Sequence, residues 1–210
     1  MSKCRLAVLF GGCSPEYRVS LQSAHGVLTH LDPQKYEPVP LGITRDGRWF
    51  LYTGPYDALP DDTWHLGPCC VPAVLSPDRE LHGLLLLNAA GPSTLRLDAA
   101  LPVLHGRNGE DGTVQGLLEL AGIPYVGCGV LASAVSMDKL STKLIVKNLG
   151  IRQAEYVPVM KEELEQMDQV VKRVEDAFPY PVFIKPSNAG SSRGVSRADD
   201  RKSLENGLKE

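Results

Sequence analysis

The chain has 210 residues, of which 43% are hydrophobic and 22% charged, and its formal net charge is -3 at pH 7. This composition is ordinary for a soluble globular protein, and the slightly acidic balance excludes the basic surface on which nucleic-acid binding depends. No apolar run approaches the roughly 20 residues of a membrane-spanning helix, and the first residues lack a signal-peptide pattern. We therefore expect a cytoplasmic protein with no nucleic-acid or membrane partner.

The five cysteines form neither a Cys-x-x-Cys pair nor a Cys/His spacing typical of metal sites. In a cytoplasmic chain we expect them to be free thiols without a chemical role. The residues themselves therefore indicate no metal ligand and no disulfide.

The chain opens with a strand and a helix. Cys4–Phe10 is an apolar, β-rich run that two glycines end, so it predicts a buried strand. A helix follows to about Leu31, with Ser14 as a candidate N-cap and Pro15 suited to a first helical position. The glycine turn lacks the Gly-x-Gly-x-x-Gly spacing, so a nicotinamide site is not indicated. We expect the buried face of the helix to carry Val19, Val27, Leu28 and Leu31.

The next strand predicted is Tyr36–Ile43, and its two prolines, Pro38 and Pro40, should place it near a sheet edge or make it irregular. Residues 46–96 show no steady period and are rich in Pro, Gly and Asp. We interpret them as a peripheral hairpin plus loop. Short strands are expected there at Arg48–Tyr52 and Glu80–Leu87.

The stretch Leu101–Gly127 predicts one β-loop-α-β unit. An apolar strand, Leu101–Leu104, leads into His105 and a glycine-rich loop; a helix from Thr113 follows, with Gly122 suited to its C-cap. Ile123–Val126 then predicts a second strand, parallel to the first because a helix connects them. Ligands bind at the carboxyl ends of such strands, which is where His105 lies.

A second set of elements follows about residue 150, where we expect a domain boundary. Before it, Ser136 is a candidate cap for a helix from Met137 to about Leu149, with Lys139 in the first turn. A cation there is unfavourable toward the helix dipole, and most lysines in such a position are simply solvated surface residues; the functional alternative is an anion nearby, such as phosphate. After it, the patterns predict a strand at Ile151–Val159, a helix at Lys161–Ala177, a strand at Val182–Lys185, a loop at Asn188–Gly194, a return strand from Val195 and helical sequence at the end.

The loop after the strand of Lys185 also carries chemistry. The lysine stem can pack within the strand while its ammonium reaches a polar pocket. Gly190, Ser191, Ser192 and Gly194 form a segment whose backbone N–H groups can surround phosphate oxygens. Taken alone, the loop is more consistent with an ordinary flexible hairpin tip than with a phosphate site.

Three segments together resemble one family. FGGCSPEYRVSLQSA, HGRNGEDGTVQGLLELAGIPYVG with SMDK, and FIKPSNAGSSRG are similar to D-alanine–D-alanine ligases and their vancomycin-resistance relatives, which make D-alanyl–D-serine or D-alanyl–D-lactate. The resemblance implies an α/β fold: a doubly wound parallel sheet, the Rossmann-like pre-ATP-grasp domain, over residues 1–150 with the peripheral insertion at 46–96. The first half of an ATP-grasp domain would then occupy residues 151–210.

The resemblance also implies residue roles. Glu16 would hold the ammonium of the first D-alanine, with His105 beside that subsite. Ser191 would hydrogen-bond Glu16 and help to close the site. On the nucleotide side, the implied residues are Lys139 and Lys185 on the ATP phosphates, Ser192 facing the nucleotide, and the loop glycines Gly190 and Gly194.

The implied reaction is phosphorylation of a D-alanine carboxylate by ATP, followed by attack of a second D-amino or D-hydroxy acid, for peptidoglycan synthesis in the bacterial cell wall. ATP and Mg²⁺ are the implied cofactors, and a homodimer is the expected assembly. The Mg²⁺ ligands of the family are not found in this chain, which we expect to be truncated and to have little or no activity alone. The alternatives are a non-catalytic remnant that binds a small molecule or dimerises, and another ATP-grasp carboxylate–amine ligase.

Overall fold

The protein is described by a computed structural model that covers residues 3–209. The chain divides into two compact units, which we name unit 1 (Met1–Ala134) and unit 2 (Val135–Glu210). Within residues 3–209, none of the helices combines the length and apolar character that crossing a membrane requires.

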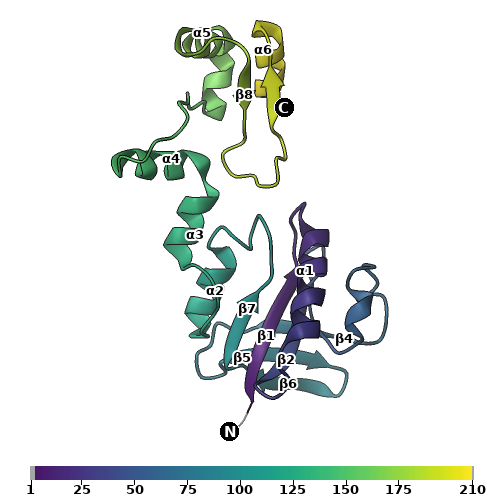
Figure 1. Ribbon diagram of the computed structural model, residues 1–210. Coiled ribbons are helices and arrows are strands. Elements are labelled where there is room, and N and C mark those ends of the chain that lie inside the picture. Colours follow the sequence, from purple (N-terminus) through teal and green to yellow (C-terminus); the bar gives the residue numbers. More distant parts are fainter. Residues whose placement is uncertain (1–2, 210) are drawn as a thin grey trace. The chain divides into compact units, whose positions relative to one another are not determined.

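Unit 1 is built on a mixed sheet of seven strands in the order β6-β5-β4-β3-β2-β1-β7 (Figure 1). The parallel part consists of β1 (Cys4–Gly11) between β2 (Tyr36–Ile43) and β7 (Ala99–Pro102). The α/β class is confirmed, but the sheet is not wholly parallel. The antiparallel part consists of β3 (Trp49–Tyr52), β4 (Cys70–Leu75), β5 (Gly83–Asn88) and β6 (Gly91–Arg96).

The change from parallel to antiparallel pairing occurs at a tight turn. Thr44 and Arg48 close the turn between β2 and β3, with Gly47 at φ 85° in the left-handed region. Antiparallel strands can be joined by such a short turn, whereas parallel strands need a crossover connection. The Asp46-Gly47 pair is a hairpin signal that the sequence does contain. Residues 46–96 therefore supply four strands at one edge of the sheet.

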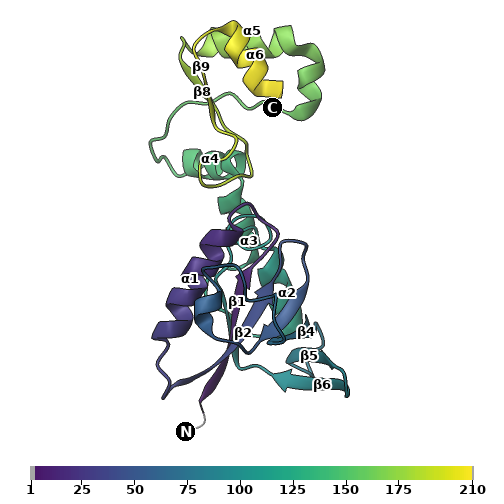
Figure 2. The same cartoon turned by 90° about the vertical axis from the view of Figure 1, so that its right-hand side faces the viewer.

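Two helices cover opposite faces of this sheet (Figure 2). Alternate residues of β1 serve the two cores: Leu6, Val8 and Phe10 face α1 (Tyr17–His30), while Ala7 and Leu9 face α2 (Thr113–Ala121). The alternation follows from the pleat of the strand, and burial on both faces explains its continuous apolar run. The predicted strand Ile123–Val126 is reduced to a single parallel bridge between Ala100 and Tyr125.

Helix α1 buries most of the predicted stripe but not its first residue. Val19 is 52% exposed, whereas Leu28 is buried and Val27 and Leu31 are half-buried against the same core. Tyr17, Ser20, Leu21 and Ala24 supply the rest of the buried face. Two of these are polar or amphipathic residues, Ser20 and Tyr17, so a count of apolar residues alone predicted the later part of the buried face and missed its start.

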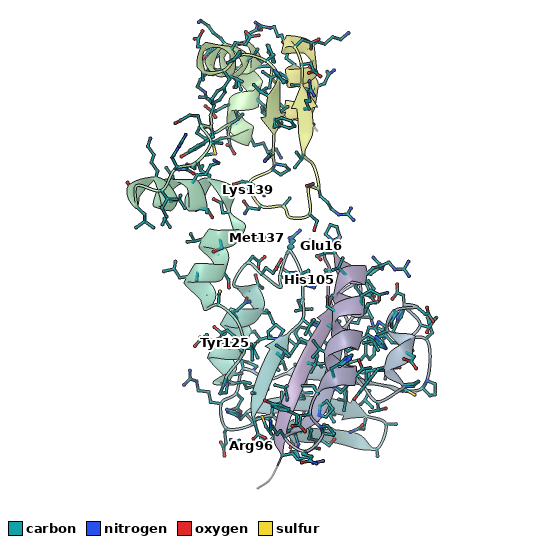
Figure 3. All side chains as sticks on the ribbon, viewed as in Figure 1. Glu16, Arg96, His105, Tyr125, Met137 and Lys139 are labelled. Atoms are coloured by element: carbon teal, nitrogen blue, oxygen red, sulfur yellow. The ribbon has the colours of Figure 1, made fainter. Side chains whose placement is uncertain are left out.

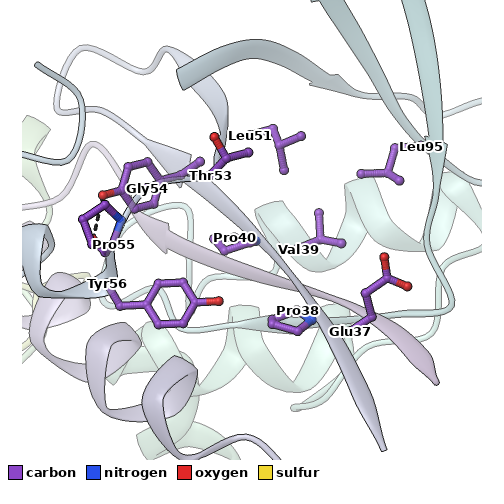
Figure 4. A pocket seen from close by; sticks show the side chains of 11 residues that line it. Glu37, Pro38, Val39, Pro40, Leu51, Thr53, Gly54, Pro55, Tyr56 and Leu95 are labelled. Carbon is purple, nitrogen blue, oxygen red and sulfur yellow. Dashed lines mark hydrogen bonds between the residues drawn. The ribbon is translucent and has the colours of Figure 1, made fainter. Parts of the chain in front are cut away.

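The two prolines do not put β2 at an edge of the sheet, since β1 and β3 flank it. However, β3 pairs only with Leu41–Ile43 of β2, so the half that contains Pro38 and Pro40 has no partner on that side. A proline lacks the N–H that a partner strand would use, which accounts for the gap. A groove lies there, and Figure 4 shows Pro38 and Pro40 among its lining side chains.

The helical segment after Gly127 is two helices rather than one. α3 (Val130–Met137) ends before Asp138, and α4 (Lys139–Asn148) begins after it. Asp138 and not Ser136 caps α4, since its carboxylate accepts the Ser141 N–H at 2.7 Å. The expected boundary near residue 150 lies after α4, whereas the compact units meet at residues 134 and 135.

Unit 2 contains a two-stranded antiparallel sheet and a small core. The core residues fully buried are Val171, Val174, Ala198 and Leu204. The predicted strand Ile151–Val159 is not a strand, because no partner pairs with it in the described part of the chain. After α4, the elements of unit 2 are η2 (Lys161–Gln166), α5 (Met167–Ala177), β8 (Val182–Ile184), β9 (Ser196–Ala198) and α6 (Arg201–Lys209).

Candidate active site

The sheet of unit 1 brings Glu16 and His105 to the same edge. Glu16 is the N-cap of α1, directly after the carboxyl end of β1, and His105 follows β7. A Cβ atom at Gly106 would stand 2.3 Å from the Glu16 Oε2 atom, so the carboxylate lies directly against the Gly106 backbone. Figure 3 shows Glu16 and His105 close together. Both side chains therefore belong to one side of the sheet, where ligands of parallel sheets bind.

Ser14 links the two segments that carry these side chains. Its hydroxyl donates to the His105 carbonyl oxygen at 2.7 Å and accepts the Glu16 N–H at 3.0 Å. Ser14 was predicted as a helix cap, but the helix begins later, and the serine instead bridges the turn after β1 to the loop after β7. This bond sets the spacing of Glu16 and His105.

The polar inner face of α1 completes the arrangement. Ser23 Oγ lies 3.2 Å from His105 Nε2 and orients the imidazole ring. Ser20 is fully buried, accepts the Gly11 N–H at 2.8 Å and donates to the Val103 carbonyl oxygen. The sequence analysis did not single out Ser20 and Ser23. Both lie on the inner side of α1, but neither is hydrophobic, so an apolar pattern does not show them.

A second network, from residues 46–96, holds the start of α1. The Tyr17 hydroxyl donates to Asp62 Oδ1 at 2.8 Å and accepts the Trp64 Nε1–H at 3.0 Å. The Arg45 guanidinium lies 4.1 Å from the centre of the Tyr17 ring. Burial raises the pKa of the Tyr17 hydroxyl, so it stays a neutral donor. Tyr17 adjoins Glu16, so this network positions the carboxylate.

The loop between His105 and α2 is closed by its own side chains. Glu110 Oε2 accepts the Gly106 N–H at 2.6 Å, and the Asp111 carboxylate accepts the N–H groups of Asn108 and Thr113. Burial alone raises the pKa of Asp111, but these N–H groups outweigh it, so the pKa lies below its usual range. An ionised carboxylate at the start of α2 also suits the helix dipole.

Unit 2 gathers a separate set of predicted residues. The Lys139 ammonium donates to the carbonyl oxygens of Ala189 and, at 3.5 Å, of Ser187. Asp138 Oδ2 accepts a hydrogen bond from the Ser187 hydroxyl at 2.5 Å. This bond is the main reason that the pKa of the Asp138 carboxyl lies below its usual range, and the bond from the Ser141 N–H is the next. The start of α4 is thereby joined to the segment after β8. Asp138 and Ser187 were not among the predicted site residues.

The loop after Lys185 has an unusual backbone. Ser191 and Ser192 adopt φ values of 48° and 57°, in the left-handed region that costs most residues energy. A Cβ atom at Gly194 would stand 2.7 Å from Pro186 Cγ, so the loop folds back over the residue after Lys185. Lys185 itself is exposed at the end of β8. Strained, exposed loops of this kind are frequent where a ligand is gripped.

No other grouping in residues 3–209 competes with these two. The groove beside Pro38 and Pro40 lies along β2, away from Glu16, and its lining mixes apolar and polar side chains. No three His, Cys, Asp or Glu side chains gather in the described residues as a metal site would need. The cysteines are free thiols, and two of them, Cys13 and Cys128, are exposed.

Comparison with known proteins finds relatives for both parts of the chain. Residues 5–128 match the family described as D-ala D-ala ligase N-terminus, and residues 145–210 match the one described as D-ala D-ala ligase C-terminus. A D-alanine–D-alanine ligase of Caldicellulosiruptor bescii is 47% identical over 205 residues, which are 97% of this chain and 56% of that protein. The chain thus spans about half the length of the relatives it matches.

Solved structures of similar fold are ligases of the same family. The VanG D-Ala:D-Ser ligase from Enterococcus faecalis superposes with a TM-score of 0.89 at 39% identity, covering 99% of this chain and 59% of that one. The D-alanine-D-alanine ligase from Coxiella burnetii gives a TM-score of 0.83 at 31% identity, covering 99% and 60%. Two matching family segments over most of the sequence, with these structures, lead to one conclusion. The chain belongs to the D-alanine–D-alanine ligase family.

Proposed function

We propose that the chain holds the first-substrate subsite and one side of the ATP site of a ligase that joins D-alanine to a second D-amino or D-hydroxy acid. The observation that carries the proposal is the Glu16 carboxylate, which lies at the carboxyl edge of the sheet, against the Gly106 backbone and beside His105. The relatives are named D-alanine–D-alanine and D-Ala:D-Ser ligases, which supports this substrate class.

Glu16 would hold the ammonium of the first D-alanine. A carboxylate and an ammonium form a charge-assisted hydrogen bond, about twice as strong as a neutral one. His105, oriented by Ser23, would stand beside that substrate. Ser191, on the loop after β8, would hydrogen-bond Glu16 and help to close the site; this role follows from the family resemblance alone.

Lys139 and Lys185 would meet the phosphates of ATP, with Ser192, Gly190 and Gly194 in the covering loop. Cations placed where phosphate charge develops lower the barrier to phosphoryl transfer. In the proposed reaction the γ-phosphoryl group passes to a D-alanine carboxylate oxygen and ADP leaves. The amine or hydroxyl of the second substrate then attacks the acyl carbon, and inorganic phosphate leaves with the bonding electron pair. Excluding water protects the acyl phosphate.

Mg²⁺ would neutralise the nucleotide phosphates when bound. The described residues do not fit such an ion, because no group of three acidic, histidine or cysteine side chains is assembled among them. We therefore assign no metal-binding role to the described residues. Use of the product in peptidoglycan, a cytoplasmic location and a homodimer remain parts of the proposal.

The test is D-alanine binding to the 210-residue protein by calorimetry. We expect D-alanine to bind and Glu16→Gln to weaken it by about tenfold or more, the equivalent of ~1.4 kcal/mol. Glu80→Gln, which changes an exposed carboxylate in the loop before β5, is the matched control and should bind as the wild type does. Unchanged binding by Glu16→Gln would contradict the proposal.

A second measurement separates a ligase from a non-catalytic binding module. Phosphate release from ATP is followed with Mg²⁺, with and without D-alanine. Release that depends on D-alanine supports catalysis. Binding of D-alanine with no such release would instead favour the binding module.

A further inference from the structure

We propose that Asp138 and Ser187 form a clamp that positions Lys139 toward the nucleotide, which makes both of them positioning residues of the ATP site. The inference rests on the proposed function, because it takes ATP phosphates as the group that Lys139 meets. All of the contacts that carry it lie within unit 2.

One carboxylate performs two tasks at the start of α4. Asp138 Oδ1 accepts the Ser141 N–H at 2.7 Å, which begins the helix. Asp138 Oδ2 accepts the Ser187 hydroxyl at 2.5 Å, which ties the helix start to the segment after β8. A helix cap needs only the first of these bonds. The second joins residues far apart in the sequence, and the same Ser187 hydroxyl accepts the Leu140 N–H of the first helical turn at 3.4 Å.

The clamp continues through Lys139. Its backbone N–H donates to the Ser187 carbonyl oxygen at 3.0 Å, and its ammonium reaches the Ala189 carbonyl oxygen at the start of the glycine-serine loop. Ser187 therefore accepts from Lys139 and donates to Asp138 at the same time. As a result, the path of the lysine stem is set relative to the loop rather than left to solvent.

This arrangement suits an anion. An ammonium in the first turn of a helix faces the positive end of the helix dipole, so the chain has to hold it there by other contacts. An ammonium has three N–H donors, and two carbonyl oxygens accept from the Lys139 group. A donor then remains for a phosphate oxygen. A lysine that is already held loses less conformational freedom when the phosphate binds.

The test separates the clamp from the helix cap. Asp138→Ser keeps a good N-cap, whose hydroxyl can accept the Ser141 N–H, but a serine is too short to reach Ser187 as well. Ser187→Ala removes the clamp from the other side and leaves the Asp138–Ser141 bond in place, but it also removes the acceptor of the Leu140 N–H. Asp138→Asn is the conservative rescue, because its amide oxygen can cap while its NH₂ group donates to the Ser187 hydroxyl.

ATP and D-alanine are titrated separately into the 210-residue protein and each variant. We expect Asp138→Ser and Ser187→Ala to weaken ATP binding by about five- to tenfold each. The double variant should bind ATP as tightly as Ser187→Ala alone, since both substitutions break the Asp138–Ser187 bond. Asp138→Asn should stay within about twofold of the wild type. D-alanine affinity should not change in any variant, which a general loss of structure would not permit.

The outcomes separate a failure of the clamp from a failure of the proposed function. If the wild type binds ATP and the two clamp variants bind it equally well, the clamp is wrong and the proposed function stands. Additive losses in the double variant also overturn it, as does a parallel loss of D-alanine affinity. If the wild type does not bind ATP, the nucleotide part of the proposed function fails and the clamp fails with it.

Discussion

The two units hold their candidate site residues by different means. In unit 1, Glu16 and His105 follow strands of a seven-stranded sheet that is packed on both faces. In unit 2, Lys139 and the glycine-serine loop lie beside a two-stranded sheet with a small core, and hydrogen bonds between exposed or half-buried groups hold them.

Under the proposed function, this difference in packing matches two separate tasks. A substrate subsite that must distinguish small molecules benefits from packing, because packed side chains have few alternative positions. A segment that closes over a nucleotide has to open again, so it needs weaker and more local bonds. The predictions below test this contrast, beginning with the largest expected effect.

The largest loss should follow from Gly11→Ala at the end of β1. A Cβ atom there would stand 2.0 Å from the Ile43 carbonyl oxygen, and the φ of 87° is strained for alanine. We expect a loss of about 3 kcal/mol or more in the free energy of unfolding of unit 1. Gly116→Ala is the control: with nothing within 4 Å, it should stabilise α2 by ~0.5–1 kcal/mol. Urea unfolding measures both, and equal stabilities would refute the close approach.

A matched pair of core variants tests whether the units unfold separately. Val8 and Val171 are both fully buried, one in each unit. Val→Ala should cost about 2 kcal/mol at either position. Both tryptophans of the chain, Trp49 and Trp64, lie in unit 1, so fluorescence reports that unit alone. Val8→Ala should lower the fluorescence midpoint in urea, and Val171→Ala should lower only a part of the far-UV circular dichroism transition. A fluorescence shift of equal size in both variants would mean one cooperative unit.

Two glutamine bonds, one buried and one half-buried, give a comparison of intermediate size. Gln115 is only 7% exposed and donates to the Gly109 carbonyl oxygen at 2.9 Å, while Gln153 makes the same kind of bond to Lys143 in unit 2. Gln115→Leu leaves the Gly109 oxygen unpaired, a cost of ~1–3 kcal/mol, and should weaken D-alanine binding by about tenfold. Gln153→Leu should leave that affinity unchanged.

The pH dependence of Gln115→Glu sharpens this further. A protonated glutamic acid can donate to the Gly109 oxygen, whereas an ionised one would repel it. D-alanine affinity of this variant should therefore rise as the pH falls, relative to the wild type. If the ratio of the D-alanine affinities of Gln115→Glu and the wild type does not change with pH, the bond to the Gly109 oxygen does not support the site.

The smallest effect concerns the ion pair of Glu163 with Arg173 in unit 2. The pKa of Glu163 is lowered from an ordinary 4.5 to about 2. The largest cause is the hydrogen bond from the Arg173 guanidinium, and the second is the hydrogen bond from the Met160 N–H. The pair therefore stabilises the fold above about pH 4.5 and loses this effect as the pH falls toward 2. Glu163→Gln should flatten the acid limb of thermal unfolding slightly, because exposed pairs contribute little. Glu155→Gln, an exposed residue in the segment before η2, is the control. An equal change in both variants would count against the pair.

Local sequence signals predicted the elements near the site well. The helix from Thr113 and its C-cap at Gly122, with φ 69°, are confirmed. The loop Asn188–Gly194 and its return strand are confirmed as well. Each of these depends on residues adjacent in the chain: a helical period, a glycine that adopts positive φ, or two short runs about a turn.

Elements that depend on a distant partner were predicted poorly. β6, Gly91–Arg96, is largely exposed and polar, and it is a strand because its backbone pairs with β5. Ile151–Val159 has the apolar pattern of a strand but finds no partner. The backbone hydrogen bonds of a strand lie between segments, so a local pattern cannot show whether they form.

The sequence by itself determined the α/β class and the glycine turns, because each depends on short-range patterns of apolar and glycine residues. Only the tertiary structure decided which of the candidate site residues meet. Ser14, Ser23 and the Gly106 backbone bring Glu16 beside His105, and Asp138 with Ser187 holds Lys139. The physical reason is that these bonds join residues far apart in the chain, where their geometry depends on how whole elements pack.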